Sequence, residues 1–210
     1  GPGTGKTTIV KGILELCQDF YPDATIQLCA PTGRAAKRLA RLSCYSAKTI
    51  HSLLKWNMED NSFGMNEDDP IEADFLIVDE PTTGLDPEER IRIRNLLVDF
   101  AEERTVLFST HVVEDLMATC NQLAVMKKGR FLYTGTMREL LNKARGHVWE
   151  CCTEDESLAR ELERKYHISS KQYTEEGIRL RLLGENMPSE SGCIACDVTL
   201  EDAYIYVTNR

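Results

Sequence analysis

The chain opens with Gly1-Pro2-Gly3-Thr4-Gly5-Lys6-Thr7-Thr8, and this stretch decides its fold class. It matches the end of the phosphate-binding loop pattern G-x-x-x-x-G-K-S/T, whose first glycine would fall just before residue 1. Glycines let backbone N–H groups turn inward around phosphate oxygens, because no Cβ atom clashes. Lys6 would bring positive charge to the β- and γ-phosphates, and the Thr7 hydroxyl would ligate Mg²⁺. We expect the remaining contacts to a nucleotide to come from Gly3, Thr4, Gly5 and Thr8.

A helix is expected directly after this loop. Ile9, Val10, Ile13 and Leu14 recur at helical spacing, which predicts a helix near residues 6–17. The N-terminus of a helix favours an anion, so the helix supports the phosphate interpretation. The alternative is a plain glycine-rich turn before a helix, but five residue types agree with the pattern in register.

A second motif lies at Ala73–Glu80, where four apolar residues precede two carboxylates. Such a run predicts a buried strand, and ligands of open α/β sheets bind at the carboxyl edge of the strands. Asp79 is placed to hold Mg²⁺, directly or through water, and Glu80 to orient or deprotonate the attacking water. Without a phosphate loop upstream, an Asp-Glu pair after a strand would be interpreted as a solvated turn.

The composition is that of an ordinary globular chain. Its 210 residues include 42% apolar and 28% charged residues, with 25 Lys and Arg against 34 Asp and Glu for a net charge of -9. These values argue against wholesale disorder, a collagen-like repeat and a membrane-spanning protein, since no apolar run approaches about 20 residues. The acidic balance argues against broad affinity for nucleic acid, although a local basic patch remains compatible with it.

The eight cysteines are scattered, and several lie in apolar runs, as Cys29 does. We therefore expect buried free thiols, no disulfide framework, and a reducing cytoplasm as the location. No secretory signal is visible. Cys193 and Cys196 form a lone C-x-x-C in a loop flanked by Pro, Ser and Gly, and zinc is disfavoured because no second pair or His follows.

The chain alternates predicted strands and helices, which is typical of a parallel sheet with helices on both faces. The fold class expected is therefore α/β, an incomplete phosphate-loop sheet with a small α+β appendage. Three regions are expected, at residues 1–80, 81–145 and 146–210. Strands are expected near 25–30, 74–79, 105–110, 122–127, 130–134, 148–153, 168–174 and 177–183. Further helices are expected near 33–42, 47–55, 87–103, 112–119, 156–166 and 199–207, and residues 57–72 are expected to be an acidic surface loop.

Residues 1–80 resemble RecD-type superfamily 1 DNA helicases. The resemblance rests on the opening loop, on Cys29–Leu39 (Cys-Ala-Pro-Thr-Gly-Arg-Ala-Ala-Lys-Arg-Leu), on Thr49–Leu54 and on the strand ending in Asp79-Glu80. It implies a helix that touches single-stranded DNA. The basic residues of that stretch recur at i, i+3, i+4 and i+7, one helical face that could follow a phosphate backbone. They are Arg34, Lys37, Arg38 and Arg41. The alternative is a solvated basic face.

Residues 76–210 instead resemble ATP-binding subunits of ABC transporters. Leu76–Pro87 (Leu-Ile-Val-Asp-Glu-Pro-Thr-Thr-Gly-Leu-Asp-Pro), Thr105–His111 and Asn121–Arg130 carry this resemblance. It implies that Asp79 serves the metal, Glu80 is the catalytic base, His111 senses the γ-phosphate and Asp86 acts across a nucleotide-sandwich dimer. The implied cofactors are ATP and Mg²⁺. The implied partners are a membrane permease and a second ATPase subunit, with the chain cytoplasmic or peripheral at the inner face of the membrane. A lone His after a strand would otherwise be an ordinary surface residue.

Each resemblance is partial. Neither a glutamine loop nor a Leu-Ser-Gly-Gly-Gln-type signature lies between Lys6 and Asp79, and no second motor domain of a helicase follows Glu80. We therefore expect a hybrid of two phosphate-loop genes joined within Leu76–Glu80, by recombination or by faulty assembly. The function expected is an ATP-hydrolysing ABC subunit, with a helicase fragment or an inactive chimera as alternatives. Because the strand that normally precedes the loop would lie before residue 1, we expect weak stability and impaired nucleotide binding from these residues alone.

Overall fold

The computed structural model describes residues 6–57, 62–64, 71–189 and 192–209. The chain divides into two compact units, Gly1–Cys120 and Asn121–Arg210. The boundaries expected after residues 80 and 145 remain predictions.

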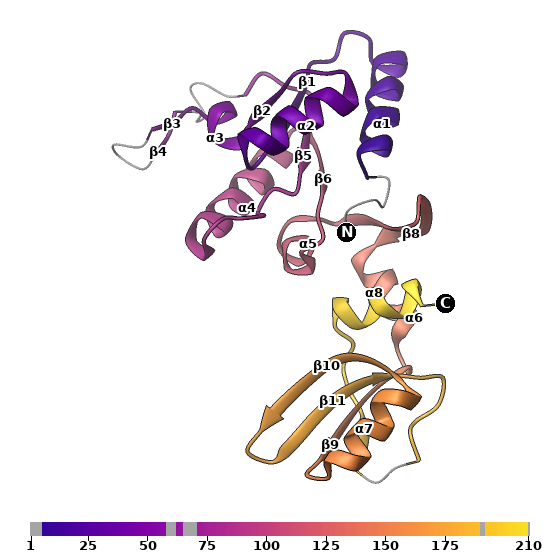
Figure 1. Cartoon of the computed structure of the whole chain (residues 1–210). Helices are drawn as coiled ribbons and strands as arrows, with labels where there is room; N and C mark the ends of the chain where they lie inside the picture. Colours follow the sequence, from indigo (N-terminus) through magenta and orange to yellow (C-terminus); the bar gives the residue numbers. More distant parts are fainter. Residues whose placement is uncertain (1–5, 58–61, 65–70, 190–191, 210) are drawn as a thin grey trace. The chain divides into compact units, whose positions relative to one another are not determined.

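The first unit is built on a parallel four-stranded sheet with the strand order β2-β1-β5-β6 (Figure 1). Its strands are β1 (Ile26–Ala30), β2 (Ala47–Thr49), β5 (Phe75–Asp79) and β6 (Thr105–Ser109). The strands expected near 25–30, 74–79 and 105–110 are therefore confirmed. Strands of a parallel sheet are covered on both faces, so they are nearly continuous apolar runs, as in β5.

Helices cover both faces of this sheet, as expected for the α/β class. They are α1 (Lys6–Phe20), α2 (Gly33–Ser43), α3 (Ile50–Leu53), α4 (Pro87–Ala101) and α5 (Val113–Thr119). Ile77 of β5 packs with residues of α1 and α2, whereas its neighbours Leu76 and Val78 pack with residues of α3 and α4. Successive side chains of a strand point to opposite faces, so one short strand contributes to both cores.

The helix expected near 47–55 is only partly correct. Ala47–Thr49 forms β2, which pairs in parallel with β1, and the helix α3 is confined to Ile50–Leu53. The Thr49 side chain accepts a hydrogen bond from the Ser52 N–H at 3.1 Å, which fixes the helix start. Strand pairing with β1 thus satisfies backbone groups that a helix would otherwise pair. The acidic loop also carries a short pair of strands, β3 (Trp56–Asn57) and β4 (Ser62–Phe63), and its residues 58–61 and 65–70 lie outside the described part.

The second unit begins with an antiparallel hairpin of β7 (Gln122–Lys127) and β8 (Arg130–Thr136). Lys128 and Gly129 between these strands both have positive φ, 51° and 74°, the geometry of a tight hairpin turn. Helix α6 (Met137–Ala144), which the sequence pattern did not predict, follows directly and starts at a capping box. There the Thr136 hydroxyl accepts from the Glu139 N–H, while the Glu139 carboxylate accepts from the Thr136 N–H.

The rest of this unit is an antiparallel sheet with the order β10-β11-β9-β12. The strands are β9 (Val148–Thr153), β10 (His167–Thr174), β11 (Gly177–Leu183) and β12 (Cys193–Ala195), and the helices are α7 (Glu156–Lys165) and α8 (Leu200–Thr208). Leu180 and Leu182 of β11 pack with Ala159 and Leu162 of α7, which gives the sheet one apolar face. Apart from β12, these elements confirm the expected strands and helices within one or two residues.

The expectation of free thiols throughout is wrong for one pair of cysteines. Cys193 does not lie in a loop but on β12, directly opposite Cys151 on β9, and the two form a disulfide with Cα atoms 4.1 Å apart. Strand pairing brings the two cysteines together across a sequence separation of 42 residues, which no local pattern could reveal. The remaining cysteines, Cys196 of the C-x-x-C included, are free.

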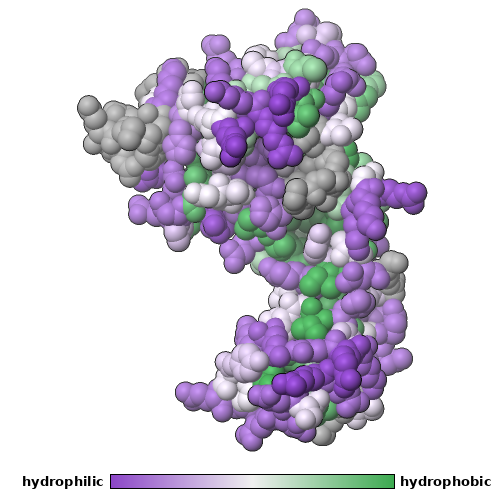
Figure 2. All heavy atoms as spheres, in the orientation of Figure 1, coloured by the Kyte–Doolittle hydropathy of each residue, from purple (hydrophilic) through white to green (hydrophobic). Residues whose placement is uncertain are grey.

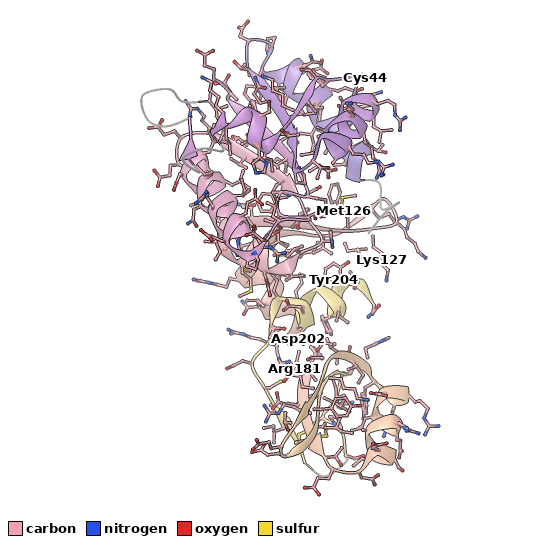
Figure 3. All side chains as sticks on the ribbon, turned by 60° about the vertical axis from the view of Figure 1, so that its left-hand side comes forward. Cys44, Met126, Lys127, Arg181, Asp202 and Tyr204 are labelled. Carbon is pink, nitrogen blue, oxygen red and sulfur yellow. A yellow bond between two sulfur atoms is a disulfide. The ribbon has the colours of Figure 1, made fainter. Side chains whose placement is uncertain are left out.

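A buried carboxylate anchors α8 to the sheet. Asp202 accepts hydrogen bonds from Arg181 Nη2 of β11 at 2.6 Å, from the Thr199 N–H at 2.8 Å and from the Ser169 hydroxyl of β10. Figure 3 places Arg181 and Asp202 close together where α8 meets the strands. The Asp202 side chain is 1% exposed, so its charge is compensated by these contacts and not by water.

Candidate functional site

The candidate site lies where two neighbouring parallel strands end. Strands β5 and β6 pair in register, with Asp79 opposite Ser109, so their carboxyl ends lie side by side. The Ser109 hydroxyl donates to Asp79 Oδ1 at 2.5 Å and orients that carboxylate. Asp79, expected to hold Mg²⁺, therefore stands at the carboxyl edge of the sheet, the edge at which open α/β sheets bind ligands.

Glu80 and His111 follow these two strand ends and contact each other. Glu80 Oε2 accepts from the His111 N–H at 3.2 Å and lies 2.5 Å from His111 Nδ1. The Glu80 side chain is 20% exposed and the His111 ring 55%, so the pair is accessible from solvent. The structure thus brings together the predicted base and the predicted γ-phosphate sensor, from sequence positions that are 31 residues apart.

The backbone at Glu80 has an uncommon conformation. Its φ is +52°, in the left-handed region that residues with a Cβ atom rarely adopt. The Glu80 N–H donates to the Ser109 carbonyl at 2.8 Å, which continues the pairing of the two strands by one residue. A sharp change of direction at this residue thus follows directly on the end of the strand, and it accompanies the contact with His111.

Asp86 ends the loop that follows β5 and begins α4. Its carboxylate accepts from the Glu89 N–H at 2.9 Å, and Pro87 occupies the first turn, both typical of a helix start. The loop turns at Gly84, whose φ is +82°. Asp86 is therefore a helix N-cap within this chain, and its expected action across a dimer remains a prediction.

Only part of the predicted phosphate-binding loop lies within the residues that the structure describes. Gly3, Thr4 and Gly5 lie outside the described residues, and Lys6, Thr7 and Thr8 form the first turn of α1. In the described ranges no group of three or more His, Cys, Asp or Glu could hold a metal ion. A hydroxyl and one carboxylate nevertheless suit Mg²⁺, which keeps waters and takes further oxygens from phosphate. The expected ligands Thr7 and Asp79 thus fit the ion chemically.

The basic residues of α2 form an exposed face. Thr32 caps this helix by accepting from the Ala35 N–H at 3.2 Å, while Ala36 and Leu39 turn inward. Figure 2 shows strongly hydrophilic surface where α2 lies in Figure 1. The exposed basic side chains are Arg34, Lys37, Arg38 and Arg41.

Four residues near the site were not foreseen. Ser109 orients Asp79, and a buried cluster behind the site contains Thr82, Thr110 and Asp115. Hydroxyl and carboxyl side chains in loops and first helical turns are usually solvated or capping groups. The sequence signal that could have found Ser109 is its position at the end of a strand adjacent to β5.

Comparison with known proteins shows which proteins this chain is similar to. A family model described as "AAA domain" matches residues 1–108. An uncharacterized ABC transporter ATP-binding protein, YxlF of Bacillus subtilis, is 34% identical over 99 residues, which cover 47% of this chain and 33% of that protein. The ATP-dependent RecD2 DNA helicase of Deinococcus radiodurans is 41% identical over 80 residues, 38% of this chain and 11% of the helicase.

A longer match is to the Nod factor export ATP-binding protein I of Burkholderia lata. It is 30% identical over 201 residues, covering 70% of this chain and 63% of that protein. The chain thus spans between about a tenth and two thirds of the length of these three relatives.

Proposed function

This chain belongs to the AAA domain family of P-loop proteins, and from that premise we propose that it binds Mg-ATP and hydrolyses it as the ATP-binding subunit of an ABC transporter. The contact between Glu80 and His111 beside Asp79 carries the proposal, because it brings the candidate base, the candidate γ-phosphate sensor and the candidate Mg²⁺ ligand to one edge of the sheet. The relatives named as ABC transporter ATP-binding proteins support the same class.

Each residue of the proposed site has a chemical task. Glu80 accepts a proton from the attacking water, and His111 holds the Glu80 carboxylate in place and contacts the γ-phosphate. Lys6 contacts the β- and γ-phosphates, and Thr7 and Asp79 bind Mg²⁺, which neutralises charge on the phosphates. The remaining nucleotide contacts come from Gly3, Thr4, Gly5, Thr8 and, from a second subunit, Asp86.

The proposed partners are a membrane permease and a second ATPase subunit, at the inner face of the membrane. No helix of the described residues has both the length and the apolarity to cross a membrane. In this proposal the permease moves the transported substrate. Co-purification of the chain with a permease encoded beside it is the measurement that checks this assignment.

ATP hydrolysis tests the proposal directly. The full chain is assayed with Mg-ATP, and Glu80→Gln is expected to lower kcat about 10²- to 10⁴-fold, because a general base contributes that much. Glu103→Gln is the matched control, since Glu103 is exposed and lies before the amino end of β6, whereas the site lies at the carboxyl end of that strand. Hydrolysis that is unchanged in both Glu80→Gln and Lys6→Ala would contradict the proposal and favour an inactive chimera.

A second candidate function is ATP-dependent action on single-stranded DNA. The exposed basic face of α2 and the RecD2 relative favour it. A protein that neutralises phosphates binds DNA less tightly as the salt concentration rises. ATPase stimulated by single-stranded DNA, and lost in a variant with Arg34 and Arg38 changed to Ala, would favour this function over transport.

We also propose that the chain is a hybrid of two phosphate-loop genes that are joined within Leu76–Glu80. Relatives of two different kinds, the RecD2 helicase and the ABC transporter ATP-binding protein YxlF, each match fewer than half of its residues, at 41% and 34% identity. Single-molecule reading of the source DNA across codons 60–100 tests whether the join is natural. One unbroken frame would establish a natural gene, and two separate frames would identify an assembly error.

A further inference from the structure

A buried carboxylate lies behind the Glu80–His111 pair. Asp115 belongs to the first turn of α5 and is 1% exposed. Acidic residues are almost never fully buried unless they are paired, so the partners of this one are informative. The two side chains that donate hydrogen bonds to it come from the loops that carry the candidate catalytic groups.

One oxygen of Asp115 accepts hydrogen bonds from both loops. The Thr82 hydroxyl donates to Asp115 Oδ2 at 2.5 Å, and the Thr110 hydroxyl donates to the same atom at 3.3 Å. Thr82 is fully buried, so its hydroxyl depends on this acceptor and not on water. Thr82 lies two residues after Glu80, and Thr110 lies directly before His111. The carboxylate therefore bridges the two loops just behind their functional residues.

Charge and backbone contacts complete the cluster. Arg94 Nη1 of α4 lies 3.9 Å from Asp115 Oδ1, an atom that makes no hydrogen bond in the described residues. The Thr110 hydroxyl also accepts from the Val112 N–H at 2.9 Å, which fixes the turn between β6 and α5. The arginine thus compensates the buried charge, while the hydroxyl donors determine where the carboxylate lies.

We propose that Asp115 is a positioning residue: through Thr82 and Thr110 it holds the loops after β5 and β6 together, so that Glu80 and His111 stay in contact. The inference rests on the proposed function for its catalytic meaning. Its structural claim, that Asp115 keeps Glu80 and His111 in contact, can be tested without measuring ATP hydrolysis. A merely structural acid would stabilise the fold but leave that contact unchanged.

The test removes the hydroxyl donor and keeps the side-chain shape. Thr82→Val deletes the hydrogen bond to Asp115, Thr82→Ser restores it, and Thr83→Val is the control on an exposed neighbour. We expect Thr82→Val to lower kcat for Mg-ATP about tenfold with KM within about twofold, because loss of one buried hydrogen bond corresponds to about that factor. Thr82→Ser and Thr83→Val are expected to stay within about twofold of the unchanged chain.

An activity-independent measurement separates this inference from the proposed function. The His111 N–H donates to Glu80 Oε2, so its hydrogen exchange measured by NMR reports the contact itself. We expect exchange to be about fivefold faster in Thr82→Val and unchanged in Thr82→Ser. If the unchanged chain hydrolyses no ATP, the proposed function is wrong. The exchange rate of the His111 N–H still shows whether Asp115 keeps Glu80 and His111 in contact. Exchange at His111 that is equal in Thr82→Val and Thr83→Val overturns the inference, even if Thr82→Val melts at a lower temperature.

Discussion

Replacing Asp202 by Ala is expected to destabilise the second unit strongly. The change removes the acceptor of Arg181 Nη2, of the Thr199 N–H and of the Ser169 hydroxyl. Breaking a buried ion pair by removing one partner costs about 3–5 kcal/mol. Arg181 keeps the Asp197 carbonyl at 2.6 Å and Glu150 at 3.5 Å, so the lower end of that range applies.

We therefore expect a loss of about 3 kcal/mol, or roughly 12–24 °C in the melting temperature of a unit of this size. Calorimetry of the full chain, in which the two units can melt separately, measures this loss. Glu201→Ala is the matched control, since Glu201 is the exposed neighbour of Asp202 on α8. The control is expected to change stability by about 0.5 kcal/mol at most.

The pH dependence gives the same prediction an independent check. Burial raises the pKa of Asp202, but hydrogen bonds from Arg181, Ser169 and Thr199 outweigh burial and hold it below the ordinary value. A lowered pKa in the folded state stabilises the fold above the unfolded pKa of about 4, and this stabilisation is lost as the pH falls through the folded value. The difference between the unchanged chain and Asp202→Ala should therefore shrink below about pH 4. A loss below 1 kcal/mol, or an equal loss in Glu201→Ala, would refute the reasoning.

Three further predictions follow from single contacts. Reduction of the Cys151–Cys193 disulfide is expected to lower the unfolding free energy by up to about 4 kcal/mol, because it releases a loop of 42 residues; denaturant titration with and without dithiothreitol measures it. Burial raises the pKa of the Cys29 thiol to about 12, so at pH 8 iodoacetamide should label exposed Cys44 but reach Cys29 only after unfolding, as mass spectrometry can determine. Asp86→Ala should cost about 1 kcal/mol through the lost N-cap, whereas Asp86→Ser should retain it; lost ATPase in both variants would indicate a role beyond capping.

Much of the first unit could be predicted because its determinants are local. The apolar run of β5 and the acids that follow it identify both a buried strand and the edge at which a ligand would bind. By contrast, β2 and β12 are three-residue strands defined by their pairing partners, β1 and β9. The strand β12 also determines the Cys151–Cys193 disulfide, so one missed strand led to one wrong expectation about the thiols.

The residues of the candidate site likewise include some that the sequence predicts and one that only the structure reveals. Glu80 was predicted because two carboxylates follow a buried apolar strand. His111 was predicted only through the resemblance to ATP-binding subunits of ABC transporters, and the pairing of β5 with β6 brings the two residues together. Asp115 was not predicted, since an acid in the first turn of a helix is usually explained by the helix dipole and by solvent. Only the hydrogen bond that Asp115 accepts from Thr82 in the folded chain indicates a positioning role.

The left-handed backbone at Glu80 has a consequence for how this position can evolve. A side chain with a Cβ atom costs about 1–2 kcal/mol in that conformation, and glycine avoids the penalty. Exchange of Glu80 for Gly should thus remove the backbone penalty, while it also removes the candidate base and its contacts with His111. Selection for heat resistance alone would therefore weigh the backbone penalty against the His111 contacts, whereas selection for turnover would act on the glutamate itself.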